Sequence, residues 1–261
     1  MTFAFAAGPF FAFMLALVRA SAWLALVPPF SSSSIPQVVR LGLAAALALA
    51  AVSQLSRAPG LAVSVTSLST AGFISDLVLQ AVTGCVLGFI TSLLLSVLSA
   101  AGSLTDMTSG LAAATIFDPI SGTQNPVTAN VYNVIMTTLL FVTGGDLLIV
   151  KGFMTSFRSV GLSSKSVSLL GPTLLSEVSF FFLAAVEIAA PVLGAMFLAY
   201  VAFGLLTKSA PQLNVMSLGF AINIALALVV VGACLAMLPG AVSTLVDRAV
   251  TDTLGLLGIS P

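Results

Sequence analysis

The uncharged run "LVLQAVTGCVLGFITSLLLSVLSAAGSLT", residues 77–105, decides the fold of this chain. It carries no charged side chain between Asp76 and Asp106, and its apolar and polar positions do not alternate. A helix of this length would be about 43 Å long, against a bilayer hydrocarbon core of about 30 Å. Because lipid offers no water to backbone groups, the run predicts a long membrane helix.

The composition of the whole chain supports the same class. Hydrophobic residues make up 59% of the 261 residues and charged residues 6%, whereas a soluble domain carries about 25% charged residues. The eight basic and eight acidic side chains give a formal net charge of zero, so no basic surface is predicted for nucleic acid. We therefore expect a membrane protein that does not bind nucleic acid.

Prolines, glycines and charges divide the chain into about six long apolar segments. We predict an all-α membrane protein in which these segments are helices, some of them kinked, arranged as helical hairpins. The first segment is interpreted as a retained helix, because it lacks the basic start of a signal peptide and exceeds the usual length of about 7–15 residues. The segments are residues 3–27, 35–53, 74–102, 129–142, 174–206 and 216–238.

Three charged side chains, Arg19, Glu177 and Glu187, lie inside apolar segments. An unpaired charge at the centre of a membrane helix costs about 2.5–3.5 kcal/mol on insertion scales, so each is either functional or paired. We favour structural pairing between helices or subunits, with Arg19 and Glu187 as buried charges. Pro191 follows Glu187 by four residues and cannot donate to its carbonyl, which predicts a helix kink there.

The sequence shows none of the residue patterns expected of an enzyme. Histidine is absent, and no phosphate loop, zinc spacing or dinucleotide motif is present, so we expect no catalysis, no cofactor and no metal. Cys85 and Cys234 lie in apolar runs and are interpreted as small buried hydrophobic residues. The motif "GCVLG", with Gly84 and Gly88 four residues apart, predicts a face on which another helix packs closely.

The stretch "DMTSGLAAATIFDPISGTQNP", residues 106–126, links two uncharged segments. It combines an apolar patch at 111–117 with several glycines and prolines, and it is too long for an ordinary membrane turn. Composition alone predicts only a connection between two helices.

The stretch "GLLTKSAPQLNVMSLGFAINI", residues 204–224, resembles the signature of the FliR family of flagellar biosynthesis proteins and their injectisome relatives. The resemblance centres on "APQLNV", residues 210–215, followed by Gly219 and Phe220. Three other stretches agree in order along the chain: "RASAWLALVPPFSSSSIPQVVRLGLA" (19–44), "GFITSLLLSVLSAAGSLTDMTSGLAAATIFDP" (88–119) and "LLFVTGGDLLIVKGFMTSF" (139–157).

Two positions depart from that family pattern. Asp106 stands where we expect glutamine, and Asp146 stands where we expect histidine.

The resemblance implies a non-catalytic subunit of the type III protein export gate, in the bacterial inner (cell) membrane at the flagellar basal body. FliP-like and FliQ-like subunits would assemble with it, FlhB-like and FlhA-like proteins would dock, and unfolded exported flagellar proteins would pass through. The single gate domain, residues 1–261, would combine a FliP-like part, about 1–170, with a FliQ-like part, about 171–261.

The resemblance also implies two groups of functional residues. The loop at 107–126 would project into the channel as a pore plug, since apolar side chains at a constriction can exclude water. The pore-plug candidates are Leu111, Ile116, Phe117, Asp118 and Pro119. The candidates for an assembly motif between the last two helices are Pro211, Gln212, Leu213, Asn214, Gly219 and Phe220.

A different class of function stays open from the residues alone. A stand-alone secondary transporter would bind a cation through Glu177 or Glu187. It would fold and transport as an isolated chain, whereas a gate subunit would co-purify with its partners.

Overall fold

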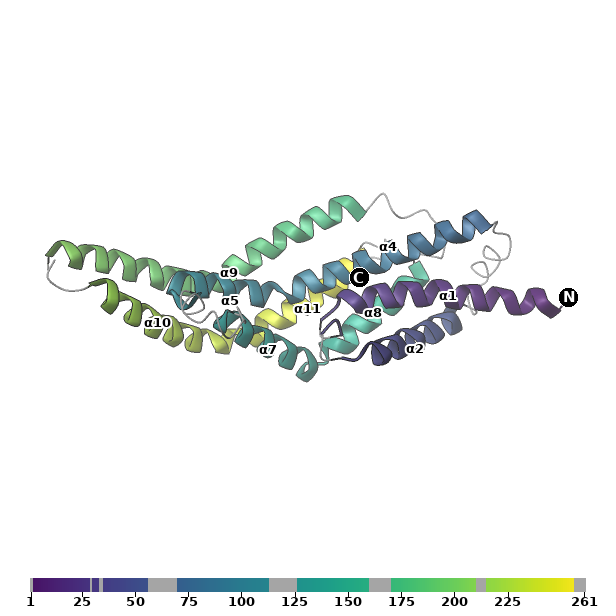
Figure 1. The fold of residues 1–261 in the computed structure, drawn as a ribbon, viewed down its shortest axis with the longest axis horizontal. Helices are drawn as coiled ribbons and strands as arrows, with labels where there is room; N and C mark the ends of the chain where they lie inside the picture. The colour runs from purple at the N-terminus through teal and green to yellow at the C-terminus, as the bar shows by residue number, and fades with distance from the viewer. Residues whose placement is uncertain are drawn as a thin grey trace. The chain divides into compact units, whose positions relative to one another are not determined.

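Every secondary-structure element that the computed structural model describes is a helix, which confirms the all-α prediction (Figure 1). The described residues are 2–28, 30–32, 35–55, 70–112, 126–159, 170–209 and 215–255. The α-helices are α1 (Thr2–Leu26), α2 (Gln37–Leu55), α4 (Thr70–Leu95), α5 (Val97–Ser109), α7 (Val127–Val142), α8 (Gly145–Ser159), α9 (Leu170–Ser209), α10 (Val215–Cys234) and α11 (Leu238–Gly255), and a 3-10 helix, η2, covers Leu235–Met237.

Four stretches within these helices are long and apolar enough to cross a membrane. They are Pro9–Leu26, Thr70–Leu95, Leu174–Ser209 and Gly219–Thr253. The pair Val127–Val142 and Gly145–Phe157 would form a fifth span, broken at its centre, and Gln37–Ser53 is a shorter apolar helix. The described part of the chain therefore has four or five candidate spans, where the sequence predicted about six.

Two predicted helix boundaries were wrong. The segment at 74–102 is two helices, because the chain makes a turn at Ser96 with φ −83° and ψ −5°. The segment ending at Pro239 and Gly240 instead continues through η2 into α11. Pro239 is the second residue of α11, and proline is tolerated in a first turn because that N–H has no partner within the helix.

The charged residues Asp146 and Lys151 both lie within α8. Gly144, with φ +71°, ends the preceding helix in a left-handed conformation that residues other than glycine rarely adopt. Asp146 then lies in the first turn of α8, where the helix dipole favours negative charge.

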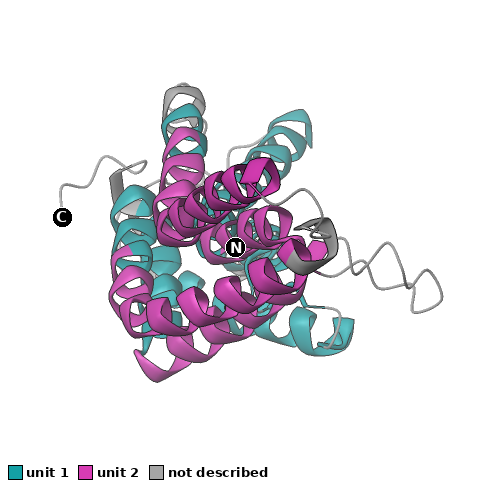
Figure 2. Cartoon of the chain, turned by 90° about the vertical axis from the view of Figure 1, so that its left-hand side faces the viewer, with its two compact units in different colours: residues 1–95, 144–178, 245–261 teal, residues 96–143, 179–244 magenta. Residues whose placement is uncertain are grey.

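The chain divides into two compact units, shown in different colours in Figure 2. Unit 1 comprises residues 1–95, 144–178 and 245–261, and unit 2 comprises residues 96–143 and 179–244. Each unit therefore combines segments that are far apart in the sequence.

In unit 1, α1 and α4 pack side by side in a parallel arrangement (Figure 1). The Phe11 and Phe73 rings lie 4.9 Å apart, and further along both helices Gly88 lies against Trp23. Between these pairs, a Cβ on Gly84 would overlap the carbonyl oxygen of Arg19. The prediction that Gly84 and Gly88 form a close helix contact is confirmed.

Helices α2 and α8 complete the core of unit 1. The α1–α2 turn is closed by Arg40, whose guanidinium donates to the carbonyls of Phe30 (3.0 Å) and Ser32 (3.1 Å). In α8, the ring of Phe153 stacks on Trp23 of α1 at a centroid distance of 4.3 Å and meets Phe157 edge-on at 5.2 Å.

In unit 2, α5 and α7 pack closely through small residues. A Cβ on Gly102 would lie 2.5 Å from the Cα of Ala129, so only glycine allows this approach. By contrast, α9 and α10 expose large apolar side chains, among them Phe197, Leu198 and Val229. Such exposure is typical of helices that face lipid or another subunit.

The expectation that both cysteines are buried was wrong for Cys85, whose side chain is exposed on α4, while Cys234 is half-buried. Both are free thiols.

We expect Gly84→Ala to lower the stability of the chain by about 1–3 kcal/mol, because the added methyl group must displace the backbone of α1. Thermal unfolding of the purified chain in detergent measures this. Gly42→Ala in α2, where a Cβ meets no atom within 4 Å, is the matched control and should be neutral or slightly stabilising. Equal melting of the two variants would contradict the packing described for α1 and α4.

Candidate functional site

Arg19 is fully buried in unit 1 and joins three helices. Its Nε donates to Gln80 Oε1 of α4 at 2.6 Å, and its Nη1 donates to the Ser156 carbonyl of α8 at 3.2 Å. The guanidinium also lies 4.6 Å from the centre of the Phe157 ring. These contacts satisfy a buried charge and hold the helices together, which fits the structural interpretation of Arg19.

A second buried charge, Asp106, lies near the end of α5 in unit 2 and is also fully buried. Its carboxylate accepts hydrogen bonds from the backbone N–H of Thr128 at 2.9 Å and of Ala129 at 3.2 Å. These amides belong to the first turn of α7, where backbone donors have no partner within the helix. Asp106 therefore joins the two helices on either side of the stretch at 107–126.

The residues that follow Asp106 contact α9 and α10. The Tyr200 hydroxyl of α9 donates to the carbonyl of Thr108 at 2.6 Å. Gly110 ends α5 with φ +84°, and a Cβ there would lie 3.0 Å from the ring of Phe220 in α10. We call the described residues Asp106–Leu111 and Pro126–Ala129 the loop base.

A cavity of about 380 Å³ lies beside the loop base, within unit 2. Its wall is mainly aromatic and glycine-rich, with a few polar groups. Its lining includes Gly110, Tyr200, Phe203, Gly219, Phe220 and Asn223.

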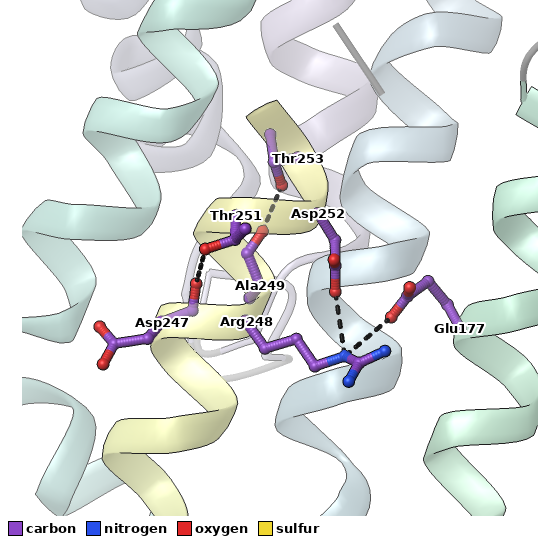
Figure 3. Close-up of polar contacts among 7 residues, drawn as sticks. All are labelled: Glu177, Asp247, Arg248, Ala249, Thr251, Asp252 and Thr253. Atoms are coloured by element: carbon purple, nitrogen blue, oxygen red, sulfur yellow. Dashed lines mark hydrogen bonds and ion pairs between the residues drawn. The ribbon is translucent and has the colours of Figure 1, made fainter. Parts of the chain in front are cut away.

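In unit 1, Arg248 of α11 lies between two carboxylates, as Figure 3 shows. Its Nε is 3.2 Å from Asp252 on the same helix and 3.7 Å from Glu177 on α9. The Glu177 side chain is 3% exposed and that of Arg248 is 37% exposed. Glu177 is thus paired within the chain, as the structural interpretation expected.

The structure brings part of the two predicted site groups together. Leu111 of the plug group is half-buried at the loop base, next to Gly110, and Phe220 of the assembly group contacts Gly110. Gly219 packs against Phe203. The plug residues Ile116, Phe117, Asp118 and Pro119 and the assembly residues Pro211, Gln212, Leu213 and Asn214 lie outside the described residues.

Glu187 and Pro191 both lie on α9, which continues through the proline. Glu187 is exposed on this chain, so the expectation of a buried charge is not met within the chain itself. The kink at Pro191 stays a prediction.

Sequence reasoning missed Asp106 and Tyr200 as contacts of the loop base. A signal for Asp106 was present, because a carboxylate between two uncharged runs needs hydrogen-bond donors. Helix α7 follows Pro126, which has no side-chain acceptor for the first amides of the helix. No comparable signal marked Tyr200.

Comparison with known proteins identifies the family. Residues 10–249 match the family described as "Bacterial export proteins, family 1". This chain belongs to that family. The predicted resemblance to the FliR family is confirmed, because several proteins similar to this chain carry the name FliR.

The chain is similar to relatives from both flagellar and other systems. FliR, the flagellar biosynthetic protein of Bacillus subtilis (strain 168), is 28% identical over 262 residues, covering 95% of this chain and 96% of FliR. The Yop proteins translocation protein T of Yersinia pestis is 27% identical over 259 residues, 95% of each chain. The surface presentation of antigens protein SpaR of Shigella flexneri is 26% identical over 155 residues, 59% of this chain and 60% of SpaR.

We expect Arg248→Met to lower the stability of this bacterial export protein by about 1–2 kcal/mol, because the buried Glu177 carboxylate loses its cation. Adding Glu177→Gln should recover at least half of that loss. Unfolding in detergent of the single and double variants measures the coupling between the two residues.

Asp247→Asn is the matched control, since Asp247 is exposed on the same helix, and it should change stability by less than about 0.5 kcal/mol. A stable Arg248→Met variant would show that the ion pair contributes nothing.

Proposed function

We propose that this chain is a non-catalytic subunit of the type III protein export gate, in the bacterial inner membrane at the flagellar basal body. It forms part of the channel through which unfolded flagellar proteins pass. The observation that carries this proposal is membership of the bacterial export proteins over residues 10–249, together with the four or five candidate membrane spans among the residues that the structure describes.

The loop at 107–126 is the candidate pore plug. Asp106 joins the described ends of this stretch, so the chain leaves α5 and enters α7 beside the same buried carboxylate. Its central patch is apolar and uncharged, which suits a constriction that closes by excluding water. Leu111, Ile116 and Phe117 would supply the closing side chains, and Asp118 and Pro119 would shape the chain.

The proposed partners are FliP-like and FliQ-like subunits, with FlhB-like and FlhA-like proteins docking to the assembly. The exposed apolar side chains of α9 and α10 support this proposal, because neighbouring helices would cover them. We also propose that residues 1–170 resemble a FliP-like part and residues 171–261 a FliQ-like part.

Deletion of residues 111–117 should raise the leak of small ions across membranes that contain the assembled complex, because the apolar patch no longer fills the channel. The leak is measured in cells that express the deletion, alongside the export of flagellar substrates. As a control, Thr138→Val alters only a hydroxyl that bonds within α7 and should leave the leak unchanged. Wild-type leak and export in the deletion would refute the plug.

Gln212→Ala should reduce the yield of complex with FliP-like partners, because we propose that Pro211, Gln212 and Asn214 form a hydrogen-bonded turn between the last two helices. Co-purification in detergent measures the yield. Ser243→Ala is the control, since that exposed hydroxyl bonds only the Gly240 carbonyl of its own helix. Equal yields from both variants would argue against the assembly motif.

The same co-purification separates the gate from a stand-alone transporter. A functional monomer or homodimer would favour the transporter. Of its two candidate carboxylates, Glu177 is paired with Arg248, which leaves Glu177 poorly suited to binding a cation, and Glu187 stays a candidate.

A further inference from the structure

Helix α7 begins without a cap from its own sequence. Its N-cap residue, Pro126, has φ −53° and ψ 129° and offers no side-chain hydrogen bond. A helix normally satisfies the amides of its second and third residues with the side chain of the N-cap residue, most often Ser, Thr, Asp or Asn. In α7 these two residues are Thr128 and Ala129.

Asp106 supplies that missing cap from another helix. Its two carboxylate oxygens lie 2.9 and 3.1 Å from the Thr128 nitrogen, and Oδ2 also lies 3.2 Å from the Ala129 nitrogen. Hydrogen bonds to an ionised acceptor are stronger than neutral ones, and the helix dipole favours negative charge at this end. The carboxylate is fully buried, so water cannot replace these donors.

Gly102 makes this geometry possible. It lies four residues before Asp106 and therefore on the same face of α5. A Cβ on Gly102 would lie 2.6 Å from the Ala129 nitrogen, so the absence of a side chain brings the start of α7 within reach of the carboxylate.

The other side of the loop base is held by Tyr200. Its hydroxyl donates to the Thr108 carbonyl, one of the last carbonyls of α5, which have no partner within the helix. The stretch that leaves α5 is thus fixed to α9 just before Gly110 turns the chain.

We infer that Asp106 and Tyr200 are positioning residues, which fix the departure from α5 and the entry into α7 at a set spacing. This inference rests on the proposed function, in that the stretch they hold is the candidate plug. Neither residue lies in the apolar patch at 111–117, so their effect on the channel acts through the placement of that patch.

The test uses the full chain in its assembled membrane complex, with the variants Asp106→Ala, Asp106→Asn and Tyr200→Phe. Hydrogen–deuterium exchange of the peptide containing Thr128 and Ala129 reports the cap, and small-ion leak reports the placement of the loop. For Asp106→Ala we expect exchange about tenfold faster, as for loss of an N-cap, together with a raised leak.

Asp106→Asn keeps one acceptor oxygen and should fall between Asp106→Ala and the wild type in both measurements. Tyr200→Phe removes a single hydroxyl from an exposed side chain, so the complex should assemble normally. In this variant we expect the Thr128 amide to stay protected from exchange and the ion leak to rise. These two variants keep the inference testable if Asp106→Ala fails to assemble.

Unchanged exchange in Asp106→Ala and Asp106→Asn would show that the cap is absent from the assembly and would overturn the inference. Faster exchange with wild-type leak, while the 111–117 deletion leaks, would overturn the positioning role and leave the plug standing. Wild-type leak in every variant, the deletion included, would overturn both proposals.

Discussion

A buried polar group in an apolar chain must find its hydrogen-bond partners within the protein, and this constraint determines which helices of each unit meet. Leaving such a group unpaired costs several kcal/mol in a lipid-like environment. The Arg19 guanidinium meets this requirement by joining α1 to α4 and α8. The Asp106 carboxylate meets it by joining α5 to α7, and the Glu177 carboxylate is paired with Arg248 as an ion pair at 3.7 Å. With 6% charged residues, the chain uses these few charges as specific links between helices.

Glycine provides the close approach on which these links depend. Gly84 lies against the backbone of Arg19. One turn earlier on the same helix, Gln80 accepts a hydrogen bond from the Arg19 guanidinium. Gly102 lies one turn before Asp106 and contacts Ala129. The backbone amide of Ala129 donates to the Asp106 carboxylate. In both units a glycine and a buried polar side chain therefore lie four residues apart on one helix. The small residue sets the distance between backbones, and the polar residue fixes which two turns face each other.

Composition and apolar runs predicted the all-α membrane class, because both follow from how few charges the chain carries. The Gly84–Gly88 contact was also predictable, since its spacing is local. The break at Ser96 and the continuation of the helix through Pro239 were not predictable in this way. Serine is compatible with a turn and proline with the first turn of a helix, but neither residue requires that conformation. The Asp106 cap was missed for another reason. Its partner Thr128 is 22 residues away, and sequence alone gives no distance across such a connection.

The described members of the two groups of site residues that the family resemblance implied, namely Leu111, Gly219 and Phe220, lie close together in unit 2. Gly110, where the chain leaves α5, packs against Phe220, which belongs to the assembly group. Tyr200 and Gly219 line the same cavity, so α9 and α10 surround the point from which the loop departs. A displacement of Phe220 would act directly on Gly110, because the Phe220 ring packs against it. A movement at the start of α10 would therefore reach the loop base through one aromatic ring.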